Sequence, residues 1–340
     1  MFQLSQGWVI YLFVFLIVPL LLSIRSYIWG PGGYAFLNKK NMQVMKGVSI
    51  LSLVMQSACV HLDLLGPLAI VISKTGILGA SLYLFCCGYE EMSLYRRHKR
   101  YLKGFLPYHV LRPLVIFLSV NVLGWFMMNI RGEGIGFLVL LDQLGHFRFF
   151  NQSSAWFIGA LIYFYIAFYV SYRTKFKMNL LFILSLFYLG VSRYLGLNPV
   201  VAGCFFMGAF CSRYKSYLFR ALQFRFSSLF LGTTFLFFLS FGWYLKGGVV
   251  ISWVLPYCFI ACVLCLLMKL QCQSYLFTFI GSCGVEIYVL HQLLLEGILA
   301  NDVEHVLIRF LFFVTVLFLF ASLIKTFFFP SIRKIYVKSR

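Results

Sequence analysis

Residues 46–63 read KGVSILSLVMQSACVHLD. The segment is rich in apolar and small residues and is long enough to cross a membrane as a helix, yet it carries Lys46 at one end and His61 and Asp63 at the other. Ionisable side chains at membrane depth are costly, so by default they face the interior of a helix bundle and mark a functional site. We therefore predict a membrane helix here with one functional face.

The composition of the whole chain agrees with a membrane protein. Of the 340 residues 62% are hydrophobic and 11% are charged, and the mean hydropathy is +0.90. Soluble domains are about 45–50% apolar and about 25% charged. The net charge of +20 arises from 29 Lys and Arg against 9 Asp and Glu. Because the basic residues form short clusters between apolar runs, they indicate cytoplasmic membrane loops rather than a surface for nucleic acid.

Apolar runs of suitable length predict an all-α, polytopic transmembrane helix bundle of about eleven spans. Of the 29 Lys and Arg, 22 fall in alternate loops and the C-terminal end, and five fall in the intervening loops. This bias predicts that the N-terminus is outside and the C-terminus inside. Arg25 directly follows the first run and no basic residue precedes it, so we expect a retained anchor rather than a cleaved signal peptide. The expected spans lie near residues 7–24, 46–62, 76–91, 108–129, 154–172, 179–195, 198–212, 228–245, 249–268, 279–298 and 306–328.

Three segments carry polar residues that suit chemistry. In the first, Lys46 and Ser57 are eleven residues apart, which puts them on nearly the same helix face about 16 Å apart. His61 lies one turn beyond Ser57, with Asp63 just after it. The alternative is structural: Lys46 as an interfacial anchor, Ser57 bonded to a helix carbonyl and His61 among the headgroups.

The second segment is YEEMSLYRRHKRYLKGFLPYHVLRPL, residues 89–114, whose basic residues precede His109 and Arg112. Such a patch suits the phosphates of a cytosolic cofactor, although an ordinary positive-inside loop has the same charge.

The third segment is GSCGVEIYVLHQLLLEG, residues 281–297. Gly284, Tyr288 and His291 share one helix face, whereas Glu286 points elsewhere. An intramembrane His on that face suits a substrate contact or a proton relay, and a structural hydrogen bond between helices is an equal alternative.

The cysteines predict no metal site. Cys262 and Cys265 form a C-x-x-C pair, but there is no second pair and no nearby His to complete a zinc site. With Cys258 they fall at helical spacing and are expected to pack.

Read in order, five short motifs resemble the acyltransferase type 3 family of integral membrane acyltransferases. The resemblance covers roughly residues 46–329, which are ten of the eleven spans, and leaves the first span as an N-terminal addition. It implies three parts: residues 1–45 as a helix with a basic inner loop, 46–329 as the acyltransferase-like domain and 330–340 as a basic cytoplasmic tail. The motifs are KGVSILSLVMQS (46–57), GASLYLFCCGY (79–89), YLKGFLPYHVLRPL (101–114), AWFIGALIYFYI (155–166) and GVEIYVLH (284–291).

The chain departs from the family pattern at its key positions. The family's opening helix usually has an Arg and, eleven residues later, a catalytic His, and here these positions are Lys46 and Ser57. His109 stands in place of one of a pair of arginines, while Arg112 is retained. Ser81 matches a position that is commonly acidic in the family, and Cys87 one that is commonly Ser. The resemblance thus implies either a divergent enzyme or a relative that has lost catalysis.

The activity that the resemblance implies is transfer of an acyl group, expected to be acetyl from acetyl-CoA, across the membrane to a hydroxyl outside. The acceptor would be a bacterial surface polysaccharide or its lipid-linked precursor, and the location a bacterial inner membrane. His61 would be the base, or Ser57 an acyl carrier activated by His61. The expected roles of the other residues are donor phosphate binding by Lys46, Arg97, Arg100 and Arg112, and acceptor or acyl contact by Asp63, Trp156, Tyr288 and His291.

Neither a metal nor nucleic acid is expected as a partner. Membrane lipids are expected to surround the protein, and the sequence leaves open whether it forms a homo-oligomer. Two other classes remain as alternatives. One is a catalytically degenerate relative that acts as a transporter or scaffold. The other is a polysaccharide polymerase or flippase, although a polymerase would be expected to have a larger charged outer loop.

Overall fold

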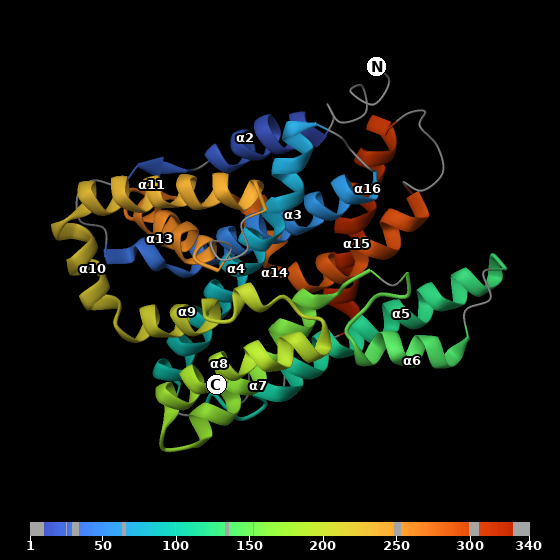
Figure 1. The fold of residues 1–340 in the computed structure, drawn as a ribbon, viewed down its shortest axis with the longest axis horizontal. Coiled ribbons are helices and arrows are strands. Elements are labelled where there is room, and N and C mark those ends of the chain that lie inside the picture. Colours follow the sequence, from blue (N-terminus) through green and yellow to red (C-terminus); the bar gives the residue numbers. More distant parts are fainter. Residues whose placement is uncertain are drawn as a thin grey trace.

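The protein is an all-helical polytopic bundle (Figure 1). The computed structural model describes residues 10–24, 26–28, 34–62, 66–98, 100–132, 136–151, 153–247, 253–298 and 306–328. It is 84% helical. The elements are η1 (Phe13–Ile17), α2 (Val18–Ser23), β1 (Tyr27–Ile28), η2 (Tyr34–Leu37), α3 (Lys39–His61), α4 (Pro67–Arg97), η3 (Pro107–Leu111), α5 (Arg112–Ile130), α6 (Phe137–Gly145), α7 (Trp156–Arg173), α8 (Lys177–Leu195), η4 (Pro199–Val201), α9 (Cys204–Arg213), α10 (Lys215–Phe224), α11 (Phe226–Leu245), α13 (Leu255–Leu267), β2 (Leu270–Gln271), α14 (Tyr275–Ser282), α15 (Gly284–Ile298), α16 (Val306–Leu323) and η5 (Ile324–Phe328).

Each of the eleven predicted runs contains an apolar helix, but the helices differ in length. Within the described residues, seven are long and apolar enough to cross a membrane, and the bent pair α14–α15 passes the same test as an eighth. Three shorter apolar helices cover Ile10–Ser23, Pro199–Arg213 and Leu255–Leu267. The seven lie in α3, α4, η3 with α5, α7, α8, α11, and α16 with η5.

Two boundaries differ from those expected from the sequence. Helix α4 has 31 residues and begins at Pro67, well before the predicted start at residue 76, because Pro67 suits the first helical turn, where its missing N–H is not needed. Lys74 therefore lies within α4 rather than in a loop. The run 279–298 is not one straight helix, because α14 and α15 meet at an angle of 80°.

Glycines on both sides of this bend bring the backbone close to α3 and α4. A β-carbon on Gly281 would lie 2.0 Å from the carbonyl oxygen of Gln43, and one on Gly284 would lie 3.0 Å from the hydroxyl of Tyr83. Only glycine permits such close approach. The bend therefore lets both halves of the broken helix pack against α3.

Helices α3 and α4 form the centre of the bundle. Helix α3 packs against α4, α14 and α15, and α4 packs against α9 on its other side. The ribbon shows α3 and α4 between the α11–α13 group and the α5–α8 group (Figure 1). A short antiparallel pair, β1 with β2, joins Tyr27 to Gln271 and Ile28 to Leu270.

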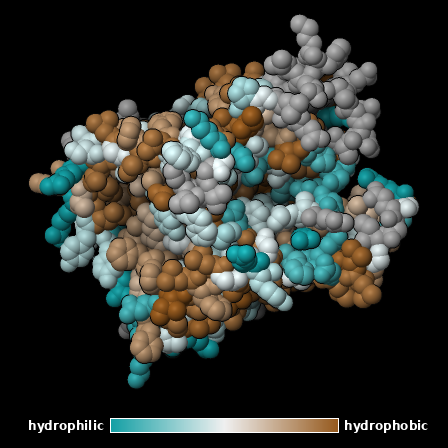
Figure 2. Space-filling model, in the orientation of Figure 1, coloured by the Kyte–Doolittle hydropathy of each residue, from teal (hydrophilic) through white to brown (hydrophobic). Residues whose placement is uncertain are grey.

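The outer faces of several helices are apolar. Figure 2 shows hydrophobic residues over α8 and over the end of α6. In α8, Phe187 is exposed, and in α6 the exposed fraction of Leu138 reaches 79%. Such contiguous apolar surface is stable in lipid and unfavourable in water, which agrees with a multi-pass membrane protein.

Candidate functional site

A serine and a histidine from two helices meet inside the bundle. Ser57 of α3 and His291 of α15 are joined by a hydrogen bond of 3.0 Å between Oγ and Nε2. The other ring nitrogen of His291, Nδ1, contacts the backbone carbonyl oxygen of Tyr288. A carbonyl oxygen only accepts, so Nδ1 carries the proton and Nε2 is the basic nitrogen. The Ser57 hydroxyl therefore donates to an imidazole in the tautomer that suits a general base.

Aromatic rings enclose the imidazole. The exposed fraction of His291 is 1%, and the ring of Phe149 meets it edge-on at 6.3 Å. Ser57, by contrast, is only half-buried. The imidazole is thus more deeply buried than the serine to which it is bonded.

Two of the predicted substrate residues, Trp156 and Tyr288, contact the same phenylalanine. The ring of Phe157 lies 4.8 Å from that of Tyr288 and 6.2 Å from that of Trp156, and Tyr288 is in turn 5.1 Å from His291. The N-terminal turn of α7 thereby packs against Tyr288, the ring next to the imidazole of His291.

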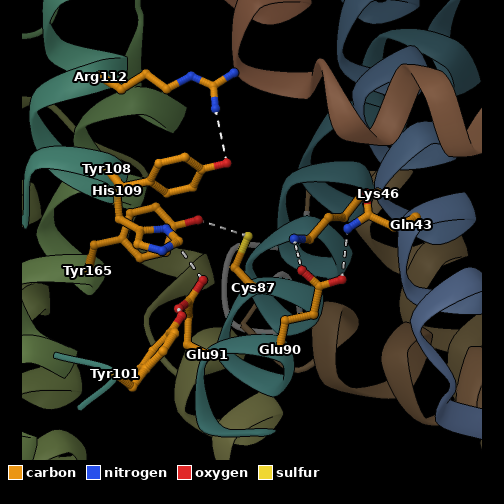
Figure 3. A network of polar contacts seen from close by, with 10 residues as sticks. All are labelled: Gln43, Lys46, Cys87, Glu90, Glu91, Tyr101, Tyr108, His109, Arg112 and Tyr165. Carbon is orange, nitrogen blue, oxygen red and sulfur yellow. Dashed lines mark hydrogen bonds and ion pairs between the residues drawn. The ribbon is translucent and has the colours of Figure 1, made fainter. Parts of the chain in front are cut away.

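A buried ion pair lies on the same face of α3 as Ser57, toward the other end of the helix. The Lys46 ammonium is paired with the Glu90 carboxylate of α4, and the side-chain amide of Gln43 donates to that carboxylate at 3.0 Å (Figure 3). The exposed fraction of the Lys46 residue is 7%. The predicted cationic end of the helix is therefore present, but a carboxylate neutralises it.

Arg112 also has a carboxylate partner. Its guanidinium is paired with Glu286 of α15, whose exposed fraction is 1%, and Nη1 lies 3.4 Å from the Tyr108 hydroxyl. Glu286 is on a different face of α15 from His291, as the helical spacing indicates. One helix thus carries both the imidazole that bonds to Ser57 and the carboxylate that pairs with Arg112.

A second acidic residue of α4 organises the start of α5. Glu91 accepts a hydrogen bond from the Tyr101 hydroxyl and lies 3.5 Å from Nδ1 of His109 (Figure 3). The His109 ring stacks on Phe105 at 4.5 Å. His109 therefore fixes the basic loop against α4.

Tyr83 connects the ion pairs with the Ser57–His291 site. The Lys46 ammonium lies 5.6 Å from the centre of the Tyr83 ring, and that ring lies 5.2 Å from Phe157. Since Phe157 contacts Tyr288, a continuous row of side chains leads from Lys46 to His291. Lys46 and Ser57 are separated by eleven residues of one helix, about 16 Å.

Other predicted residues lie elsewhere. His61 ends α3, and Ser57 bonds to His291 rather than to His61. Arg97 and Arg100 are exposed, unlike Lys46, and form no ion pair with the described residues. Asp63 lies outside the described residues, as does the predicted tail 330–340.

Sequence reasoning missed the acidic partners and Tyr83. With 9 Asp and Glu in the chain, the presence of Glu90 and Glu286 beside or within apolar runs was a usable signal. Their basic partners lie on other helices, and residue spacing within one helix does not identify such partners.

The cysteines lie in packing positions. All ten are free thiols, and Cys262 lies 3.5 Å from the Thr234 hydroxyl of α11. Among the described residues no group of three His, Cys, Asp or Glu is arranged to hold a metal ion. The cationic residues Lys46 and Arg112 suit an anionic ligand that would compete with their carboxylate partners.

Comparison of the chain with protein family models, with curated proteins and with solved structures finds no match.

Proposed function

We propose that the protein is an acyl-CoA-dependent O-acyltransferase of a bacterial cytoplasmic membrane. It moves an acyl group, in our proposal acetyl, from the cytoplasmic side to a hydroxyl of a surface polysaccharide or of its lipid-linked precursor. The observation that carries the proposal is the hydrogen bond from the Ser57 hydroxyl to His291. Acyl transfer needs a neutral base within hydrogen-bond reach of a hydroxyl, and Nε2 of His291 meets that requirement.

In this proposal His291 takes the role of base that the sequence analysis assigned to His61. His291 is buried, which favours the neutral imidazole, and the hydrogen bond to the Tyr288 carbonyl fixes the orientation of the ring. His61 is not the hydrogen-bond partner of Ser57. Trp156 and Tyr288 line the acyl path beside the base.

The donor's phosphates bind at the cytoplasmic end of the bundle in this proposal. Lys46 begins the row of side chains that leads to His291, and Arg112 is paired with Glu286 of the helix that carries His291. Arg97 and Arg100 are exposed, and in this proposal they attract the anionic donor. The assignment uses the predicted topology of eleven spans with the N-terminus outside.

The test is transfer from labelled acetyl-CoA to native cell-envelope glycan in membranes that contain the protein. Wild type is expected to label the glycan, and His291→Ala to lower the rate by about 10²–10⁴-fold, the usual contribution of a general base. His61→Ala is the matched control and is expected to retain most of the activity. Loss of transfer with His61→Ala alone would return the base to His61, and no transfer by intact wild type would contradict the proposal.

A transporter is the second candidate, and one observation favours it. The 80° break between α14 and α15, with Glu286 in the first turn after it, resembles the discontinuous helices at which transporters bind substrates. Reconstituted vesicles that take up labelled acetyl groups without esterifying any acceptor would support the transporter.

A further inference from the structure

We propose that Ser57 itself carries the acyl group, as an ester on Oγ, between the donor and the final acceptor. This inference rests on the proposed acyltransferase function and specifies its chemical route. The alternative route is direct transfer, in which donor and acceptor occupy the site together and Ser57 only makes a hydrogen bond.

The geometry favours the serine as the nucleophile. Its hydroxyl donates to Nε2 at 3.0 Å, and the Tyr288 carbonyl holds Nδ1. A nucleophile, a base and a group that orients the base in this order are what activates serine in covalent acyl transfer. Here the orienting group is a backbone carbonyl of the same helix.

The occupancy of Nε2 also argues against direct transfer. The basic nitrogen already accepts a hydrogen bond from Ser57, and the imidazole is 1% exposed. An external hydroxyl would have to displace Ser57 to reach it. The first hydroxyl to be deprotonated when an acyl donor enters is therefore that of Ser57.

The distance between Lys46 and Ser57 along α3 explains why an acyl-serine intermediate would be useful. The donor's anionic part is expected near Lys46, about 16 Å from Ser57 along the helix, whereas the acceptor approaches from the opposite side. With an acyl-serine the two substrates react in turn and never need to occupy the site at once.

The two steps balance. In the first, Oγ of Ser57 attacks the thioester carbonyl carbon, its proton passes to Nε2 of His291, the C–S bond breaks, and the CoA thiolate leaves with that proton as a free thiol. In the second, the acceptor hydroxyl gives its proton to Nε2 and attacks the ester carbonyl. The bond between that carbon and Ser57 Oγ breaks, and His291 returns the proton to Ser57.

The burial of His291 protects the intermediate. Hydrolysis of the ester needs water at Nε2, and the rings of Phe149 and Tyr288 lie against the imidazole. The acyl-serine is therefore expected to persist when no acceptor is present.

The experiment uses the full-length protein, purified in detergent, with labelled acetyl-CoA and no acceptor. We expect one acetyl group on the peptide that contains Ser57, and exchange of label between acetyl-CoA and free CoA. In Ser57→Ala both signals are expected to fall by at least about 100-fold. Ser52→Ala is the matched control, because Ser52 is on the same helix with its hydroxyl bonded to the Thr75 carbonyl at 3.1 Å, and it is expected to keep both.

The possible outcomes distinguish failure of the acyl-serine intermediate from failure of the proposed acyltransferase function. Mapping the label on wild type needs no variant, so a folding defect in Ser57→Ala leaves the result interpretable. If wild type acetylates glycan while Ser57 stays unlabelled and no CoA exchange occurs, the carrier is wrong and the acyltransferase proposal stands. If wild type neither acetylates glycan nor exchanges CoA, the acyltransferase proposal fails and the carrier fails with it.

Discussion

Ser57 and His291 are 234 positions apart in the sequence and share a hydrogen bond of 3.0 Å between α3 and α15. Their meeting depends on the bend between α14 and α15, because a straight helix would carry His291 along a different course relative to α3. The glycine contacts that stabilise this bend are therefore part of what builds the site.

Replacing Lys46 with Met is expected to raise the KM for acyl-CoA, because the substitution removes a cation from the proposed donor end of the site. Lys40→Met serves as the control, since Lys40 is exposed near the start of the same helix. Steady-state kinetics with varied acyl-CoA provide the measurement, and an unchanged KM would count against Lys46 as a donor contact.

Glu286→Gln is expected to act in the opposite direction on donor binding. Neutralising the carboxylate that is paired with Arg112 leaves the guanidinium available to a phosphate, so the KM for acyl-CoA falls while the protein becomes less stable. Glu296→Gln is the comparison, because Glu296 of the same helix bonds to Asn151 at 2.6 Å instead of to a cation. A KM that rises in Glu286→Gln would place Arg112 outside the donor site.

The Lys46–Glu90 pair is expected to show strong coupling in stability. Removing either partner leaves a charge in a largely buried site and costs about 3 kcal/mol, whereas Lys46→Met combined with Glu90→Met removes both charges and restores much of the loss. Unfolding of the four proteins in detergent micelles measures the coupling. Additive effects of the two single substitutions would show that the pair is too solvated to matter.

Substitution of the glycines between α4 and α9 by larger residues is expected to destabilise the packing of these two helices. A β-carbon on Gly208 would lie 2.0 Å from the Phe85 carbonyl oxygen, and one on Gly88 would lie 2.0 Å from that of Phe205. Gly208→Ala should therefore destabilise the protein by about 1–3 kcal/mol. Gly232→Ala in α11 is the control, because a β-carbon there meets nothing within 4 Å, and thermal unfolding that shifts equally in both variants would refute the prediction.

The helical, membrane-bound character of the chain could be predicted from composition and apolar runs, because both depend on local sequence. The bend after Ser282 could not, since residues 279–298 form one nearly continuous apolar run and the break depends on how Gly281 and Gly284 pack against other helices.

The sequence indicated which residues belong to the candidate site, but not which of them contact each other. Ser57, His291 and Lys46 stand out because polar residues in apolar helices are costly. The neighbour expected for Ser57 was His61, one turn away, because helical periodicity reveals only neighbours on the same helix. The partner in the structure, His291, comes from a helix that sequence spacing cannot position.

The row from Lys46 through Tyr83 and Phe157 to Tyr288 has an electrical consequence. In the proposed reaction His291 takes and returns a proton within a membrane, where a chain of exchangeable protons from one side to the other would drain an ion gradient. Phe157 has no exchangeable side-chain proton and stands between the two tyrosines. Along this row the ring of Phe157 therefore interrupts any chain of exchangeable protons between the two tyrosines, and the proton transfer proposed at His291 would stay local to the Ser57–His291 pair.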